Sequence, residues 1–281
     1  MAAQSHSGLS VLGCELELAC DAARAAGEVA MQYYGSATAT LKEGGSPVTQ
    51  ADHAADEVIA GMLRQAFPED SVLSEESADS MERLAANRVW VVDPLDGTRE
   101  FLAQNGEFAV MIGLAVQGRP VLGVVYQPAV DRLFYAAEGG GSFLRENGRT
   151  RVLRCRPHSG PLRLVGSRSH PDRLLLEMQA ALGIRDVRPS GSVGVKCGLI
   201  ALGERDLYIH PVPYLREWDT CAPEVILREA GGAVCDCRGG ALQYNKADTR
   251  QPDGIVACEA GQLAGVLNAV SSIYSGASAA S

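Results

Sequence analysis

The sequence contains no long apolar run, no cysteine motif and no excess of positive charge, and each absence excludes a class of protein. No uninterrupted apolar stretch reaches the ~18 residues that a membrane-spanning helix needs. The first ten residues lack a basic start followed by a long apolar stretch, so we expect no secretion signal. The formal net charge of −9 argues against a nucleic acid as the partner, because phosphate-backbone contacts need a basic surface. A small phosphorylated ligand is still allowed, since bound cations can reverse the local field.

The eight cysteines are scattered, and none forms a Cys-x-x-Cys pair or has a histidine at zinc-ligand spacing. Cys235 and Cys237 are the only close pair. This pattern favours small apolar residues in a reducing cytoplasm over a redox or zinc site. What the chain does contain, over 281 residues, is 46% apolar and 21% charged residues, which is typical of a soluble globular protein. We therefore predict a soluble cytoplasmic protein of one large domain or two closely joined ones.

The first half of the chain has the pattern of an α+β unit. Apolar residues recur at helical spacing over residues 11–35 and over about 50–67. A short strand in DSVLSEES follows, then an apolar strand at Val89–Val92. From Glu107 to Arg149 several antiparallel strands are separated by glycine and proline turns. We predict an α+β, metal-binding half over residues 11–157.

Strands alternate with helices in the remaining part, as in an α/β unit. LRLVGSRS is typical of a strand and a loop, HPDRLLLEMQAALG of an amphipathic helix, and EWDTCAPEVILREAGG of a helix that ends at two glycines. We predict a smaller α/β, substrate-binding half over residues 158–272. The small and polar residues at the two ends predict disorder over residues 1–10 and 273–281.

The apolar strand at Val89–Val92 is followed directly by two carboxylates. Asp93 and Asp96 stand in RVWVVDPLDGTREF. The proline between them fixes the backbone and Gly97 permits a tight turn, so both carboxylates and the Leu95 carbonyl can converge on one side. Carboxylates this close repel one another unless a cation lies between them. A hard divalent ion with oxygen ligands fits, which favours magnesium over zinc or calcium.

Two further acidic signals have both a functional and a purely structural interpretation. Glu75 and Glu76 follow a strand in LSEES, and they are either metal ligands or part of a solvated face. Asp219 lies at a helix start in EWDT. It is either a plain N-cap or part of a phosphate site, because a helix N-terminus has free amides and a positive dipole end. The residues alone leave these alternatives open.

A phosphatase of the haloacid dehalogenase class is a rival interpretation of the DPLDGT stretch. Those enzymes carry D-x-D-G-T after an apolar strand, with the first aspartate as covalent nucleophile. Here the spacing is one residue longer, and the motif comes late in the chain, after two expected helices. Both differences argue against that class.

The acidic motifs together resemble the inositol monophosphatase superfamily of magnesium-dependent, lithium-sensitive phosphatases. The match consists of D-P-[LI]-D-G-T at 93–98, S-E-E at 74–76 and W-D-x-x-A-x-x-x-[IV] at 218–226, with EAGG following. It spans roughly Cys20 to Glu259. The resemblance implies a fold that combines α+β and α/β parts, a layered α/β/α/β/α sandwich of the inositol monophosphatase and fructose-1,6-bisphosphatase type. The site would lie between the two halves.

Four further stretches, SPVTQAD, DGTREFLAQNGEFAV, GVVYQP and SRSH, resemble the 3′(2′),5′-bisphosphate nucleotidases of that superfamily. Those enzymes convert adenosine 3′,5′-bisphosphate, a by-product of sulfate assimilation and sulfotransfer, to AMP and phosphate. An inositol phosphatase usually carries a glutamate where this chain has Val212. An inositol-1-monophosphatase or a related sugar-phosphate monoesterase is the alternative. A non-catalytic phosphate sensor is a second one, although a sensor has no use for a water-activating pair.

The resemblance also implies a role for each acidic residue. Glu75, Asp93 and the Leu95 carbonyl would hold a first magnesium ion. Asp93, Asp96 and Asp219 would hold a second ion about 3.5–4 Å away. A weaker third ion beside Glu75 is allowed.

Catalysis would fall to Thr98 and Asp52, a hydrogen-bonded pair, together with Glu75. The pair would take a proton from a metal-bound water that attacks phosphorus in line, without a phosphoenzyme. The Gly97 and Thr98 amides would cradle the departing phosphate. The other predicted substrate-binding residues are Ser167, Arg168, Ser192, Lys196, Arg216 and Asp219. The expected partner is a small nucleotide, the expected assembly a monomer or homodimer, and lithium sensitivity is carried over as a prediction.

Overall fold

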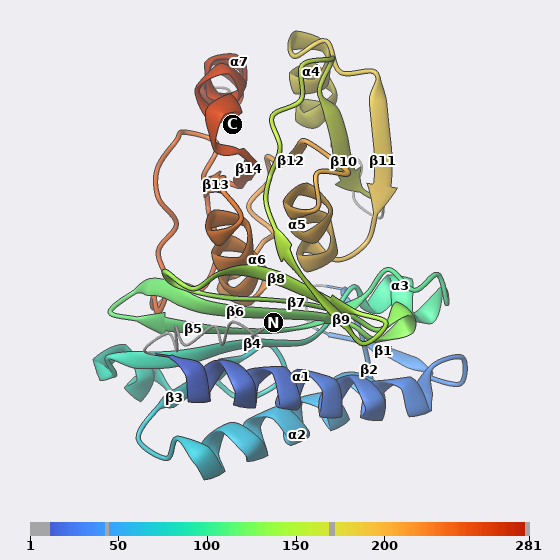
Figure 1. Ribbon diagram of the computed structural model, residues 1–281, viewed down its shortest axis with the longest axis vertical. Coiled ribbons are helices and arrows are strands. Elements are labelled where there is room, and N and C mark those ends of the chain that lie inside the picture. The colour runs from blue at the N-terminus through green and yellow to red at the C-terminus, as the bar shows by residue number, and fades with distance from the viewer. Residues whose placement is uncertain (1–11, 43–44, 169–171, 279–281) are drawn as a thin grey trace, which may run out of the picture.

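The computed structural model describes residues 12–42, 45–168 and 172–278 (Figure 1). The segment 1–10, predicted to be disordered, and Ser169 and His170 of the SRSH motif lie outside these residues.

A seven-stranded sheet forms the centre of the first half. Its strand order is β3 (Ser71–Ser74), β4 (Arg88–Asp96), β5 (Ala109–Val116), β6 (Arg119–Gln127), β7 (Arg132–Ala137), β8 (Gly141–Glu146) and β9 (Arg149–Leu153). Only the β3–β4 pair is parallel among these strands. A separate two-stranded ribbon joins β1 (Ala39–Leu41) to β2 (Pro47–Thr49). The predicted meander is therefore present, and it extends the parallel pair that carries the acidic motifs.

The second half contains a five-stranded sheet of mixed direction. Its order is β11 (Asp186–Ser190), β10 (Arg163–Ser167), β12 (Leu207–His210), β14 (Ile255–Glu259) and β13 (Gly232–Cys235). β10 runs parallel to β11 and β12, and β14 runs antiparallel to β12 and β13. Strand β11 contains an Arg-Pro pair, and because proline is uncommon within strands, the local sequence pattern does not indicate this strand.

Seven α-helices cover the faces of these sheets in the described residues. They are α1 (Gly13–Tyr33), α2 (Gln50–Ala66), α3 (Thr98–Leu102), α4 (Arg173–Ala181), α5 (Val193–Ala201), α6 (Glu217–Glu229) and α7 (Leu263–Ser278), with short 3-10 turns η1 (Met81–Ala85), η2 (Pro128–Val130) and η3 (Ala260–Gln262). Helices α1 and α2 lie beneath the first sheet, α5 and α6 between the sheets, and α4 and α7 on the far side of the second (Figure 1). This confirms the predicted α/β/α/β/α sandwich.

The strand β4 is apolar on both faces because both faces are covered. Trp90 and Val92 pack in the cluster with α1 and α2, whereas Val89 and Val91 pack in the cluster with α5 and α6. Side chains alternate along a strand, so Asp93 follows Val91 on the face toward α6. The alternation of side chains along β4 thus places the Asp93 carboxylate on the face that lies toward the second sheet.

Helix α6 lies directly on the first sheet because two paired glycines leave room for it. Gly113 and Gly123 are cross-strand partners on β5 and β6. A Cβ at Gly123 would stand 2.2 Å from the Ala222 carbonyl oxygen, and one at Gly113 would stand 2.5 Å from the Cys221 sulfur. Only glycine permits this approach, which sets the height of α6 above β4.

The C-terminal tail differs from its prediction. Helix α7 continues through Ser278, so the segment 273–278 is helical, not disordered. Val270 and Tyr274 are buried in the cluster of the second sheet. Burial by tertiary packing stabilises a helix whose small residues show only a weak apolar stripe.

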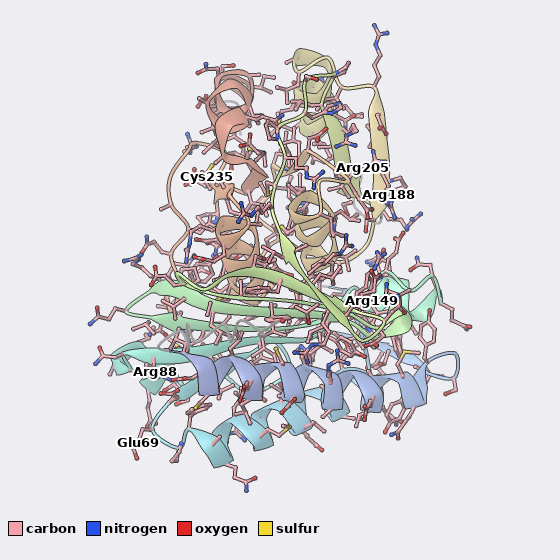
Figure 2. All side chains as sticks on the ribbon, in the orientation of Figure 1. Glu69, Arg88, Arg149, Arg188, Arg205 and Cys235 are labelled. Atoms are coloured by element: carbon pink, nitrogen blue, oxygen red, sulfur yellow. The ribbon has the colours of Figure 1, made fainter. Side chains whose placement is uncertain are left out.

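The cysteines are free and mostly buried. Cys235 lies in the second half, well away from β4 (Figure 2). Burial raises the pKa of Cys235 to about 11 and that of Cys237 to about 12, which keeps both thiols protonated and unreactive. Among the residues that the structure describes, no helix has the length and apolar character to cross a membrane.

Candidate active site

A cavity of about 890 Å³ opens between the two halves. Its lining includes the end of β4 and the first residues of α3, α5 and α6. The N-terminus of a helix is the positive end of its dipole. The cavity therefore suits an anion, provided that the carboxylates within it are neutralised.

Three aspartates come together on the wall of this cavity. Asp93, Asp96 and Asp219 each offer one carboxylate oxygen, and these oxygens lie within 4.8 Å of one another. Asp93 and Asp96 are three residues apart on β4, a spacing that points side chains to opposite faces of a regular strand. The β4–β5 register shifts between them, because Asp93 pairs with Met111 but Asp96 pairs with Ala109. This β-bulge adds one residue and turns both carboxylates to the same side.

Each of the three carboxylates uses one oxygen in a protein hydrogen bond. Asp93 Oδ1 accepts the Leu95 amide at 3.0 Å, and Asp219 Oδ2 accepts the Arg216 amide at 2.5 Å. Asp96 Oδ2 accepts the Ser192 hydroxyl at 2.5 Å. These hydrogen bonds fix the orientation of each carboxylate. Within the described part of the chain, they leave the second oxygen of each carboxylate for a cation.

The charges of this cluster are not balanced by the protein alone. Burial raises the pKa of Asp93 well above its usual range, and the nearby Glu75, Asp96 and Asp219 raise it further. Burial, and next to it the nearby Asp96 and Glu75, raise the pKa of Asp219 well above its usual range. Burial also raises the pKa of Asp96, although Lys196 opposes the shift. A set of convergent, mutually repelling oxygen donors fits a hard divalent cation such as magnesium.

Glu75 lies on the cavity wall but is held by a lysine. The Lys42 ammonium donates to Glu75 at 2.7 Å and to Glu76 at 2.5 Å. Ser74 and Ser77, on either side, both donate to buried Asp56 of α2. The loop that carries Glu75 is therefore held to α2 by Asp56. The Lys42 ammonium provides a positive charge next to the Glu75 carboxylate.

Thr98 and Asp52 form the hydrogen bond that the motifs predict. Asp52 is the third residue of α2, and its Oδ2 accepts the Thr49 amide at 2.8 Å and the Thr49 hydroxyl at 2.7 Å. Its Oδ1 accepts the Thr98 hydroxyl at 3.0 Å. Gly97, with φ of 99°, makes the left-handed turn that brings Thr98 from β4 into α3. An ionised carboxylate only accepts, so the Thr98 oxygen keeps its lone pairs for a group in the cavity.

The predicted substrate-binding residues divide into two groups. Gly97, Thr98, Ser167, Lys196, Arg216 and Asp219 line the cavity. Lys196 is 2% exposed, and its ammonium lies 5.0 Å from the centre of the Tyr208 ring. Burial lowers its pKa, and Asp96 opposes that shift. The Arg216 guanidinium donates to the Thr249 hydroxyl at 3.3 Å.

Arg168 and Ser192 lie elsewhere. The Arg168 guanidinium forms two bonds of 2.8 Å with the carboxylate of Glu107, and Arg168 lies off the cavity lining. Ser192 is fully buried, caps α5 by accepting the Val195 amide at 3.1 Å, and supports Asp96 from behind. The structure thus brings neither side chain to the cavity surface.

Several lining residues were not among those predicted. Lys42 precedes a glycine-rich turn that indicates only a change of direction, and Tyr208 is hidden in the apolar strand LYIH. Tyr214, which is 72% exposed, also lines the cavity. Nothing in the local pattern distinguishes Lys42 or Tyr208 as a residue of the cavity.

The fold is a sandwich of five alternating layers, and three carboxylates that could hold a metal ion are clustered between its two halves. The family model for the inositol monophosphatase family matches residues 13–274. A 3′(2′),5′-bisphosphate nucleotidase CysQ from Salmonella typhimurium is 42% identical over 238 residues, covering 83% of this chain and 95% of the relative. The chain belongs to the inositol monophosphatase family, whose members are metal-dependent phosphatases.

Two solved structures that resemble this chain support the same family assignment. CysQ from Bacteroides thetaiotaomicron is 32% identical with a TM-score of 0.77, covering 88% of this chain and 97% of that one. An inositol monophosphatase from Anabaena (Nostoc) sp. PCC 7120 is 30% identical with a TM-score of 0.73, covering 92% and 96%. The family predicted from the motifs is confirmed, and so is the likeness to the bisphosphate nucleotidases within it.

Proposed function

We propose that this chain is a magnesium-dependent 3′(2′),5′-bisphosphate nucleotidase that hydrolyses adenosine 3′,5′-bisphosphate to AMP and phosphate. The observation that carries the proposal is the set of three convergent carboxylates beside the Thr98–Asp52 hydrogen bond. The names of relatives at about 40% identity support the choice of substrate. A small nucleotide is thus the proposed partner, and a monomer or homodimer in the cytoplasm stays a prediction.

The proposed metal ligands are the carboxylates of Glu75, Asp93, Asp96 and Asp219 and the carbonyl of Leu95. When bound, magnesium ions neutralise charge on the phosphate and lower the pKa of water. Two ions fit the number of oxygen donors, and a third beside Glu75 is part of the proposal. Lys42 donates to Glu75 Oε1, so Oε2 is the oxygen of that carboxylate assigned to an ion.

Thr98 and Asp52 are proposed to move the proton. Asp52 Oδ1 accepts the Thr98 hydroxyl, so the threonine oxygen can accept a hydrogen bond from the attacking water. As that water attacks phosphorus, its proton passes to the Thr98 oxygen while the Thr98 proton passes to Asp52. The two groups remain hydrogen-bonded throughout, and the carboxylate needs no contact with the substrate.

Lys196 and Arg216 are proposed to bind the second phosphate. Both cations are on the cavity lining, Lys196 from α5 and Arg216 at the start of α6. The Gly97 and Thr98 amides are assigned to the departing phosphate, and Ser167 to the nucleotide. A substrate with two separated phosphates uses both cations, whereas an inositol monophosphate uses only one site.

The test is phosphate release in magnesium with three substrates side by side: adenosine 3′,5′-bisphosphate, inositol 1-phosphate and fructose 1,6-bisphosphate. We expect a preference of about a hundredfold for the nucleotide, which corresponds to about 2.7 kcal/mol of transition-state binding. Asp96→Asn should abolish release, and Asp186→Asn, on the surface of β11, is the matched control. Dominant activity on the inositol ester would keep the metal site but reject the substrate. Binding without turnover would favour a sensor.

A further inference from the structure

Two deeply buried charged side chains, Arg83 and Glu217, have no part in the proposed reaction. Arg83 is 1% exposed and Glu217 is 0% exposed. A buried charge is costly unless it is paired or hydrogen-bonded. Both side chains are satisfied by the same short turn, Asn245–Lys246, which lies between them.

Glu217 holds this turn from the side of α6. Its Oε2 accepts the Asn245 amide at 2.6 Å, and its Oε1 accepts the Lys246 amide at 2.9 Å. Asn245 has φ of 57°, a left-handed conformation that asparagine tolerates better than most residues. The turn therefore presents two adjacent amides to one carboxylate, and each carboxylate oxygen is used once.

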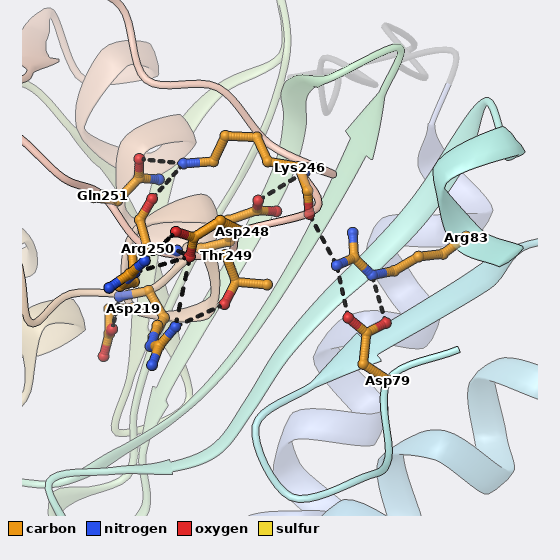
Figure 3. A network of polar contacts seen from close by, with 10 residues as sticks. Asp79, Arg83, Asp219, Lys246, Asp248, Thr249, Arg250 and Gln251 are labelled. Carbon is orange, nitrogen blue, oxygen red and sulfur yellow. Dashed lines mark hydrogen bonds and ion pairs between the residues drawn. The ribbon is translucent and has the colours of Figure 1, made fainter. Parts of the chain in front are cut away.

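Arg83 holds the same turn from the side of the first sheet (Figure 3). Its guanidinium donates to the Asn245 side-chain oxygen at 2.8 Å and to the Lys246 carbonyl at 2.9 Å. The Asn245 side-chain nitrogen donates back to the Arg83 carbonyl at 2.8 Å. Asp79 pins the guanidinium with two bonds of 2.7 and 2.8 Å.

Both ends of this connection lie next to proposed metal ligands. Arg83 is in η1, on the short segment between Glu75 and β4. Glu217 is the first residue of α6, two positions before Asp219, and its own amide donates to the Thr249 carbonyl at 2.9 Å. The Asn245–Lys246 turn thus links the segment between Glu75 and β4 to the helix end that carries Asp219.

We propose that Glu217 and Arg83 are positioning residues that hold the Asp219 carboxylate at metal-binding distance from Asp93 and Asp96. The inference rests on the metal-dependent activity proposed above. Without a cation, the three carboxylates repel one another and tend to move α6 away from β4. The hydrogen bonds through the Asn245–Lys246 turn oppose that movement, so the site is already assembled when the ion arrives. Groups that orient metal ligands typically change metal affinity by about 10–100-fold when they are replaced.

The test measures binding of Mn²⁺ alone, with free ion followed by electron paramagnetic resonance, in wild type and Glu217→Gln. Glutamine keeps the size but has one acceptor oxygen, so one of the two turn amides loses its partner. Glu229→Gln is the matched control, because Glu229 is on the same helix and accepts the Gly141 amide at 3.1 Å, far from the cavity. Melting temperatures of the metal-free proteins are recorded alongside.

We expect Glu217→Gln to bind Mn²⁺ about tenfold more weakly than wild type. Glu229→Gln should bind Mn²⁺ as tightly as wild type does. This should hold even if the melting temperatures of Glu229→Gln and Glu217→Gln fall by similar amounts. Equal Mn²⁺ affinity in Glu217→Gln and wild type, or an equal loss in both variants, would overturn the inference. A purely structural role predicts that second result.

A second pair of variants, one test and one control, keeps the inference testable if Glu217→Gln does not fold. Arg83→Lys removes the forked contact with the turn and should also weaken Mn²⁺ binding. Arg228→Lys is its control, since Arg228 donates to the Pro120 carbonyl at 2.9 Å at the other end of α6. Unchanged Mn²⁺ affinity in Arg83→Lys would overturn the inference. A wild type that binds Mn²⁺ but prefers inositol 1-phosphate rejects the proposed substrate alone, whereas a wild type that binds no Mn²⁺ rejects both.

Discussion

Replacing Gly123 by alanine tests whether the approach of α6 to the first sheet is what assembles the metal site. The new Cβ would lie 2.2 Å from the Ala222 carbonyl oxygen, and an ordinary contact begins near 3.4 Å. Helix α6 or strand β6 therefore has to move by about 1 Å, because the obstacle is backbone and cannot rotate away. Asp219 is on the same helix, less than one turn before Ala222, so most of this movement reaches the carboxylate cluster.

We expect three measurable losses in Gly123→Ala: in stability, in kcat/KM and in Mn²⁺ affinity. Overpacking of a buried site costs about 1–3 kcal/mol, which should appear as a lower free energy of unfolding in urea. A misplacement of about 1 Å in an active site can cost about a hundredfold in rate, so kcat/KM should fall by that order, together with Mn²⁺ affinity.

Gly61→Ala is the matched control for this experiment. Gly61 is exposed within α2, and a Cβ there meets nothing within 4 Å. Alanine in a helix interior is better than glycine by about 0.5–1 kcal/mol, so this variant should gain stability and keep its activity. Wild-type stability and metal affinity in Gly123→Ala would refute the reasoning that the glycine sets the height of α6.

Three further predictions concern the proton path, pH and lithium. Thr98→Val should lower kcat by about 10²–10⁴-fold at unchanged Mn²⁺ affinity, and a rate within tenfold of wild type would exclude the Thr98–Asp52 pair as proton acceptor. Burial raises the pKa of Glu224 to about 7, so its contribution to stability is greatest below about 4.5 and is lost as pH rises toward 7. Glu224→Gln should therefore flatten a decline of about 3 kcal/mol in urea titrations over that range, and a parallel decline in both proteins would contradict this origin. Lithium should inhibit magnesium-dependent phosphate release, and full activity at tens of millimolar lithium would remove this carried-over property while leaving the reaction intact.

The local sequence pattern was sufficient to predict the helices and strands whose formation depends on residues close in sequence. Helices α1 and α2 follow from apolar periodicity, which reports directly which face is buried, and strand β4 follows from its continuous apolar run. The motif at 93–98 was also sufficient to predict the Thr98–Asp52 contact through the family resemblance. Helix α7 was missed, because its burial against the second sheet is decided by residues distant in sequence.

The contacts of individual side chains could be predicted less well from the sequence. Arg168 and Lys196 are both cations that were predicted to bind the substrate, yet one pairs with Glu107 at the surface and the other is buried on the cavity wall. Lys42 binds Glu75 across 33 residues of sequence. A cation pairs with whichever carboxylate the fold brings near, and one-dimensional patterns carry no such distances.

By itself the sequence determined the chemical inventory: the acidic motifs, the strand that carries Asp93 and the family to which they belong. Only the tertiary structure decided that these groups form a site. The β-bulge between Asp93 and Asp96 turns two carboxylates to one side, and the glycines beneath α6 let Asp219 approach them. Convergence of like charges is unfavourable locally, so it has to be imposed by packing and hydrogen bonds from elements far apart in the chain.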